Sequence, residues 1–185
     1  MISADGTKLC CQVSGDGPPM VLVHGTLGSK ETFGLVEPLL STSYRVLTFD
    51  RRGRGESGDG PDYSIEREAD DIEAVVDSFD EPVHLVAHSF GATCSVLAVA
   101  RGHMDLASLT LYEPPSLRGT DPSEWEQAVT HAASGEYEAA LRAFAPLAGV
   151  SDGGDRHADH NAAGLGALLR RDADTGPRTR RSSHL

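Results

Sequence analysis

The sequence around Ser89 has the form that presents a serine hydroxyl for nucleophilic attack. Residues 87–91 read AHSFG; the apolar run VHLVA leads into the serine, and the small-residue run GATCSVLAVA follows it. A nucleophile elbow needs a tiny residue two positions before and two after the serine, because strand and helix backbones nearly touch there. Ala87 and Gly91 meet this need. We predict that Ser89 is the nucleophile; the alternative is that it only caps a helix N-terminus.

A second serine lies in the literal pattern G-x-S-x-G. Residues 149–153 read GVSDG, with Ser151 at the centre. This copy follows a helical stretch and precedes a polar one, so that it lacks the strand-to-helix context that an elbow requires. We therefore do not expect Ser151 to react.

A glycine-rich loop supplies the groups that would stabilise an oxyanion. Residues 24–29 read HGTLGS and follow an apolar strand pattern. Such a loop can direct one backbone N–H at the oxyanion, while the residue after the nucleophile directs another. Thr26 and Phe90 are the predicted donors. The alternative is a turn shaped by packing alone.

Three other motifs lack the context that their chemistry requires. Residues 53–58 form a literal G-x-G-x-x-G after a strand, but a Gly-Pro turn follows instead of a helix N-terminus that could bind a pyrophosphate. Residues 25–30 resemble part of a P-loop without its contiguous Gly-Lys-Ser/Thr. His157 and His160 have metal-ligand spacing in a tail where a chance pair is the simpler explanation. We predict no metal and no cofactor.

Alternating strand and helix patterns position these motifs. Strands are predicted at residues 7–14, 20–24, 44–49, 83–87 and 106–112, and helices at 29–40, 64–79, 90–100, 123–131 and 136–144. The clearest helix begins after Ser64, a predicted N-cap, and has one apolar face. Strands separated by helices predict an α/β fold: a mostly parallel sheet with helices on both faces.

Composition limits the kinds of partner. The 185 residues include 28 acidic and 16 Lys or Arg side chains, for a net charge of -12. This charge opposes nucleic acid and anionic membrane surfaces as main partners. The first residues, MISADGTKLCCQ, have no secretion signal and no apolar run is long enough to span a bilayer, so we expect a cytoplasmic protein. Three cysteines form neither a disulfide framework nor a zinc site.

Four motifs in order resemble the α/β-hydrolase family, in its small cytoplasmic serine-hydrolase type. They are residues 24–29, 50–57 (DRRGRGES), 87–91 and 111–115 (LYEPP), and the resemblance covers residues 3–150. It implies the α/β-hydrolase fold and a serine nucleophile with an oxyanion hole. It also implies that residues 50–57 are a structural loop, and that His24 and His88 belong to the motifs and are not the catalytic base.

The rest of the family's triad has no evident place in this sequence. The acid and the histidine follow later strands of the sheet, but residues 151–185 contain no Val, Ile, Met, Phe, Tyr or Trp and cannot supply a buried strand. Acidic residues and histidines of this tail are Asp152, Asp155, His157, Asp159, His160 and His184. Glu113, after the strand that follows the elbow, is a candidate acid; the alternative is a pocket-lining or structural role.

These patterns predict three segments. Residues 1–113 form the N-terminal part of the α/β-hydrolase core, 114–150 begin a helical cap, and 151–185 are an irregular or disordered tail, for which a frame-shifted origin is an open alternative. A sheet that is incomplete at the C-terminus would leave the strand at 106–112 as an open edge, through which we expect self-association.

Two functions remain open from the sequence. The first is a serine hydrolase that acts on a small-molecule ester or related acyl substrate through Ser89. The second is a truncated, catalytically inactive hydrolase fragment that lacks the triad acid and histidine. A serine rather than an aspartate nucleophile argues against dehalogenase and epoxide-hydrolase chemistry.

Overall fold

The computed structural model describes residues 1–115, 126–128, 130, 131 and 134–147. The chain divides into two compact units, residues 1–116 and 117–185. The first unit contains the sheet and every motif described above except the Ser151 pattern and the histidines of the tail. The predicted segment boundaries at 113 and 150 stay predictions.

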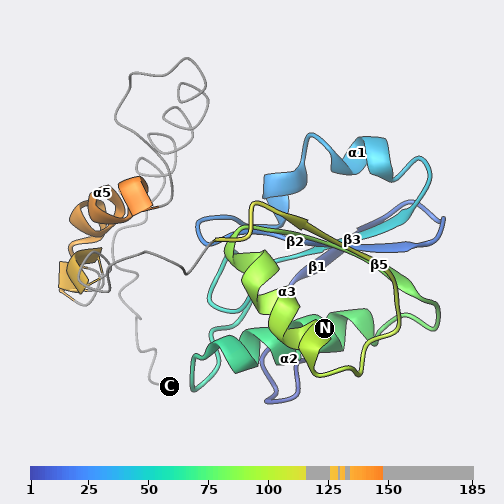
Figure 1. The fold of residues 1–185 in the computed structure, drawn as a ribbon, viewed down its shortest axis with the longest axis horizontal. Coiled ribbons are helices and arrows are strands. Elements are labelled where there is room, and N and C mark those ends of the chain that lie inside the picture. The colour runs from blue at the N-terminus through green and yellow to red at the C-terminus, as the bar shows by residue number, and fades with distance from the viewer. Residues whose placement is uncertain (116–125, 129, 132–133, 148–185) are drawn as a thin grey trace, which may run out of the picture. The chain divides into compact units, whose positions relative to one another are not determined.

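A five-stranded sheet forms the centre of the first unit (Figure 1). Its strands are β1 (Cys11–Ser14), β2 (Pro19–Val23), β3 (Arg45–Phe49), β4 (Val83–His88) and β5 (Leu106–Tyr112). They lie in the order β1-β3-β2-β4-β5; β1 is antiparallel to β3 and the other pairs are parallel. This arrangement confirms the predicted mostly parallel sheet.

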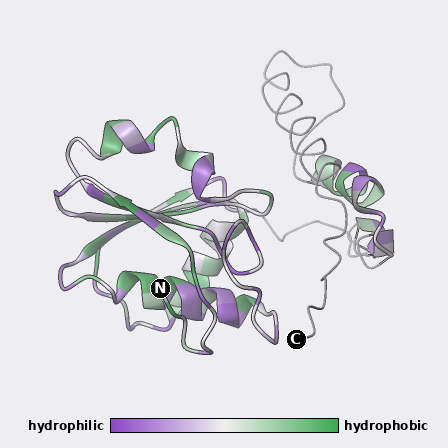
Figure 2. Cartoon of the chain, turned by 180° about the vertical axis from the view of Figure 1, so that it is seen from behind, coloured by the Kyte–Doolittle hydropathy of each residue, from purple (hydrophilic) through white to green (hydrophobic). Residues whose placement is uncertain are grey.

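Helices cover both faces of this sheet (Figure 1). On one face lie α2 (Ile65–Val76) and α3 (Phe90–Ala100), and on the other the 3-10 turn η1 (Lys30–Phe33) and α1 (Glu37–Leu40). Alternate residues of β2 enter two separate apolar clusters, Val21 and Val23 against α2 and α3, and Met20 and Leu22 on the opposite face. Ser64 caps α2 as predicted, with its hydroxyl accepting from Arg67 N–H at 3.3 Å. In Figure 2, α2 carries both apolar and polar residues, as a helix packed on one face requires.

Two predicted elements differ from those observed. The continuous helix at 29–40 is wrong: η1 ends before Gly34 and α1 begins only at Glu37. Pro38 explains the break, because it has no N–H to donate to the Gly34 carbonyl, as a continuous helix would require, and is tolerated in the first turn of α1. The strand at 7–14 starts only at Cys11, because Cys10 N–H is bonded to the Ser57 hydroxyl at 2.9 Å.

The second unit contains α5 (Tyr137–Leu147), which confirms the predicted helix at 136–144 and extends it by about one turn. Residues 126–128, 130 and 131 are helical, in agreement with the predicted helix at 123–131. Residues 151–185 lie outside the described residues. None of the described helices combines the length and apolar character that crossing a bilayer requires.

Candidate functional site

Ser89 sits in a strained turn between β4 and α3. Its φ of 52° and ψ of -126° lie in a region that side-chain-bearing residues rarely adopt and that costs about 1–3 kcal/mol. The turn is fixed on both sides: Ser89 N–H donates to Tyr112 O at 2.9 Å, and Ser89 O accepts from Ala92 N–H at 2.9 Å. The hydroxyl makes no capping hydrogen bond to α3. The helix-cap alternative therefore does not explain this serine.

Close backbone contact explains the small residues around the elbow. A Cβ atom on Gly91 would lie 2.4 Å from His24 O and 2.9 Å from Val23 O. A Cβ atom on Gly25 would lie 3.0 Å from the Ser89 Cβ atom. Ala87 is fully buried in β4, between Val23 and Leu111 on the neighbouring strands. The loop after β2 therefore lies directly against the serine.

His24 holds this loop and is not a base for Ser89. Its ring is fully buried; Nε2 accepts from Arg51 N–H at 3.1 Å, so that Nδ1 carries the proton and donates to Gly25 O at 2.8 Å. Burial lowers the pKa of His24 from its ordinary 6.5 to about 4. The ring is neutral at physiological pH and both of its nitrogens are engaged.

The lowered pKa of His24 makes stability pH-dependent. The unfolded chain binds a proton at His24 more readily than the folded chain, so stability is full above pH 6.5 and is lost as the pH falls toward 4. Between pH 7 and pH 5 we expect His24 to account for a loss of about 2 kcal/mol. Urea unfolding at the two pH values should show a smaller loss in His24→Asn and an unchanged loss in His103→Asn, an exposed control. An equal loss in all three proteins would contradict the assignment.

Two backbone donors near the serine have no acceptor in the part of the chain that the structure describes. Gly28 N–H donates to Gly25 O at 3.3 Å and closes a turn with Thr26 near its tip. Among the described residues, neither Thr26 N–H nor Phe90 N–H has a hydrogen-bond acceptor, and both residues are half-buried. Free N–H groups of this kind are what a developing oxyanion requires. They are the two donors predicted from the sequence.

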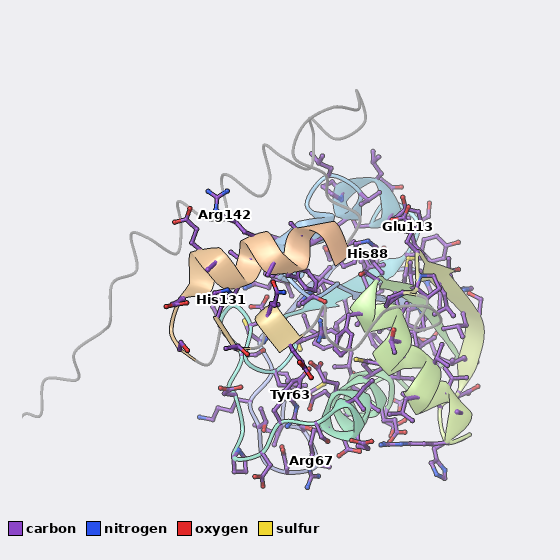
Figure 3. The ribbon with its side chains drawn as sticks, turned by 60° about the vertical axis from the view of Figure 1, so that its left-hand side comes forward. Tyr63, Arg67, His88, Glu113, His131 and Arg142 are labelled. Carbon is purple, nitrogen blue, oxygen red and sulfur yellow. The ribbon has the colours of Figure 1, made fainter. Side chains whose placement is uncertain are left out.

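His88 and Glu113 lie close together at the carboxyl ends of β4 and β5 (Figure 3), because His88 pairs with Tyr112, the residue before Glu113. The His88 and Tyr112 rings lie 5.4 Å apart. Glu113 is exposed and has a φ of 48°, the second positive φ among the described residues other than glycine. Such strain is common near functional sites. Glu113 remains a candidate acid.

The described residues do not complete a triad. Among them, no histidine ring is hydrogen-bonded to the Ser89 hydroxyl or to Glu113. The remaining candidates from the sequence lie outside the described residues: Ser151, Asp152, Asp155, His157, Asp159, His160 and His184. The structure therefore brings together the predicted nucleophile and oxyanion donors, and leaves the base and the acid without a position.

One cluster of potential metal ligands is already occupied by a side-chain cation. Ligand atoms of Cys10, Asp50 and Glu56 lie within 4.8 Å of one another. Lys30 Nζ lies 3.1 Å from Asp50 Oδ2 and 2.7 Å from Glu56 Oε2. The hydrogen bond to Glu56, together with the one to Asp50, raises the pKa of Lys30 well above its usual range. These contacts make residues 50–57 a closed structural loop, as the family resemblance implies.

Arg51 and Glu68 are two buried charges next to the site that were not singled out as functional residues in the sequence. Both side chains are fully buried and paired with each other. The available signal is the position of Glu68 in the run 64–79, on the face of α2 that also buries Ala69 and Ile72. An acidic residue on an apolar face requires a buried partner.

Comparisons with known proteins agree with this fold. A family model described as "Alpha/beta hydrolase family" matches residues 20–183. Probable oxidoreductase EphD of Mycobacterium tuberculosis (strain ATCC 25618 / H37Rv) is 37% identical over 97 residues, 49% of this chain and 16% of that protein. N-formylmaleamate deformylase of Pseudomonas putida is 34% identical over 118 residues, 62% of this chain and 44% of that protein. The chain thus spans less than half the length of these relatives.

A solved structure extends the likeness. An alpha/beta hydrolase from Sphaerobacter thermophilus DSM 20745 has a TM-score of 0.75 and 28% sequence identity. The match covers 96% of this chain and 65% of the other. Both the sequence of motifs and the arrangement of strands therefore point to one family.

Proposed function

The chain belongs to the alpha/beta hydrolase family, and from this premise we propose that it is a serine hydrolase with Ser89 as its nucleophile. Ser89 Oγ attacks an acyl carbon, and the carbonyl oxygen becomes an oxyanion that accepts hydrogen bonds from Thr26 and Phe90 N–H. The Ser89 proton passes to a histidine base and then to the leaving group. Water hydrolyses the acyl-enzyme and restores the serine.

The observation that carries this proposal is the combination of strain and free donors at one turn. Ser89 has a φ of 52° without capping α3, and Thr26 and Phe90 N–H lack acceptors among the described residues. A turn with only a structural role would be more stable if the backbone strain at Ser89 were relaxed and if both N–H groups had acceptors. A catalytic turn requires the strained backbone, which presents the serine, and the unbonded N–H groups, which receive the oxyanion.

An ester or related acyl compound of low molecular weight is the proposed substrate. N-formylmaleamate deformylase, one of the relatives, is named for removing a formyl group, which is an acyl group. Serine attack needs no metal or organic cofactor. A cytoplasmic location, and self-association through β5, remain predictions.

A second candidate function is an inactive hydrolase fragment. It is favoured by the absence of a base bonded to Ser89 among the described residues. Such a fragment would keep the elbow and the donors without turnover. The two candidates differ in whether a base reaches the serine.

A fluorophosphonate probe tests the role of Ser89. We expect wild type to be labelled faster than Ser89→Ala, because the strained turn exposes the hydroxyl and the oxyanion donors hold the phosphonyl oxygen. Mass-spectrometric peptide mapping should place the label on Ser89. Ser151→Ala is the matched control and should be labelled at the wild-type rate. Equal labelling of wild type and Ser89→Ala would remove Ser89 from the active-site role.

A further inference from the structure

A buried ion pair contacts both halves of the proposed oxyanion hole. Arg51, in the loop after β3, and Glu68, on α2, are each fully buried. Their contact is bidentate: Arg51 Nε lies 2.9 Å from Glu68 Oε2, and Arg51 Nη2 lies 2.5 Å from Glu68 Oε1. The Tyr63 hydroxyl, labelled in Figure 3, also donates to Glu68 at 3.1 Å. Glu68 therefore fixes the orientation of the guanidinium group.

The remaining nitrogen of Arg51 holds the loop that carries Thr26. Arg51 Nη1 donates to Gly25 O at 3.0 Å. This carbonyl belongs to the same planar peptide unit as Thr26 N–H, and in a trans peptide the two groups point in opposite directions. Arg51 and His24 Nδ1, which donates to the same oxygen at 2.8 Å, together fix Gly25 O on the protein side and so direct Thr26 N–H away from the protein interior. A rotation of this one peptide would remove the donor.

The Arg51 guanidinium group also packs against Phe90, whose N–H is the second proposed donor. Arg51 Cζ is 5.0 Å from the centre of the Phe90 ring, a cation–π contact. Phe90 N–H shares its peptide unit with Ser89 O, which accepts from Ala92 and Thr93 N–H at the start of α3. Packing of the Phe90 ring on Arg51 thus anchors the first residue of this helix.

We propose that Arg51, oriented by Glu68, is a positioning residue that sets both oxyanion donors, Thr26 N–H and Phe90 N–H, in their working directions. The inference rests on the proposed function for its catalytic consequence, but its structural part stands on the contacts alone. The pair is weak evidence for a role in stability, since replacing a buried ion pair by apolar residues is often neutral or stabilising. If the pair served stability alone, apolar replacement would leave the reactivity of Ser89 unchanged. If the pair positions the Gly25–Thr26 peptide, the replacement lowers that reactivity.

Arg52 and Asp71 provide a matched control one residue further along the chain. This pair is also buried and bidentate, with two contacts of 2.7 Å. Its other partners are Asp5 and Ser3 in the N-terminal segment, and within residues 1–115 no hydrogen bond joins it to Gly25 or Phe90. The double variants Arg51→Met/Glu68→Leu and Arg52→Met/Asp71→Leu each remove one buried pair together.

The experiment measures phosphonylation by a fluorophosphonate probe, with separate values of kinact and KI, in the full chain. For Arg51→Met/Glu68→Leu we expect kinact to fall about 10- to 100-fold with KI little changed, because a misdirected donor loses most of what an oxyanion contact contributes. The Arg52→Met/Asp71→Leu control should stay within about threefold of wild type, since it lies outside the network. Equal slowing of both variants, or of neither, would overturn the proposal.

Two further measurements keep the test decisive. If the first double variant does not fold, Arg51→Lys replaces it; lysine keeps the charge but lacks the planar fork, and an unchanged kinact would overturn the proposal. If wild type is not labelled at Ser89, the proposed function fails, and amide hydrogen exchange then decides the positioning role. Faster exchange at Thr26 and Phe90 in the Arg51 variant alone supports it, and unchanged exchange overturns it.

Discussion

Replacing Gly91 with alanine is expected to lower the free energy of unfolding by about 3 kcal/mol, as overpacking against fixed atoms does. Gly91 lies in α3, where helix propensity alone would favour alanine by about 0.5–1 kcal/mol. The added Cβ atom, however, would lie 2.4 Å from His24 O and 2.9 Å from Val23 O. Both are backbone atoms of the central strand and its loop, and neither can move without displacing Thr26.

Urea unfolding followed by circular dichroism measures this effect. Gly58→Ala is the control, because the nearest atom to its Cβ would be Lys8 O at 3.5 Å, an ordinary contact; we expect a change within about 0.5 kcal/mol. A midpoint for Gly91→Ala at or above that of wild type would show that strand and helix are not in contact at the elbow.

The rate of ester hydrolysis separates the two candidate functions. Ser89 must lose its proton to attack, and no base among the described residues is bonded to its hydroxyl. Without base and acid, the oxyanion hole and substrate binding leave only about 10³- to 10⁴-fold catalysis over water. The inactive-fragment candidate predicts that an activated aryl ester such as 4-nitrophenyl acetate is hydrolysed at least about a thousandfold more slowly than a typical enzyme turns over its substrate, and the serine-hydrolase candidate predicts faster turnover.

Turnover as fast as that of a typical enzyme would contradict the inactive-fragment candidate and show that a base does reach Ser89. His157 and His160 would then be the first residues to replace. Feeble turnover together with rapid labelling of Ser89 would instead show an elbow that works without its triad.

The strand-to-helix turn at Ser89 can be predicted from the sequence because its requirements are local. Ala87, Ser89 and Gly91 occupy positions where the strand-to-helix turn dictates residue size, and α3 begins and ends at the residues predicted. The helix at 29–40 is mispredicted for a local reason too. Its apolar spacing is real, but Gly34 and Pro38 divide it.

Arg51 and Glu68 show what local patterns do not provide. They lie 17 positions apart in the sequence, and their pairing depends on how β3, its loop and α2 pack together. The sequence contains a sign of it, since Glu68 and Asp71 fall among the buried residues of α2, and two adjacent arginines precede that helix. Only the tertiary fold determines that Arg51 pairs with Glu68 and Arg52 with Asp71.

A crystal structure of the protein with Ser89 phosphonylated would test the central claim most directly, namely that Ser89 faces an oxyanion hole made by Thr26 and Phe90. The account predicts a phosphonyl oxygen about 2.7–3.1 Å from both backbone nitrogens, the range that such donors require. A phosphonyl oxygen directed into solvent, or bonded to neither nitrogen, would contradict it.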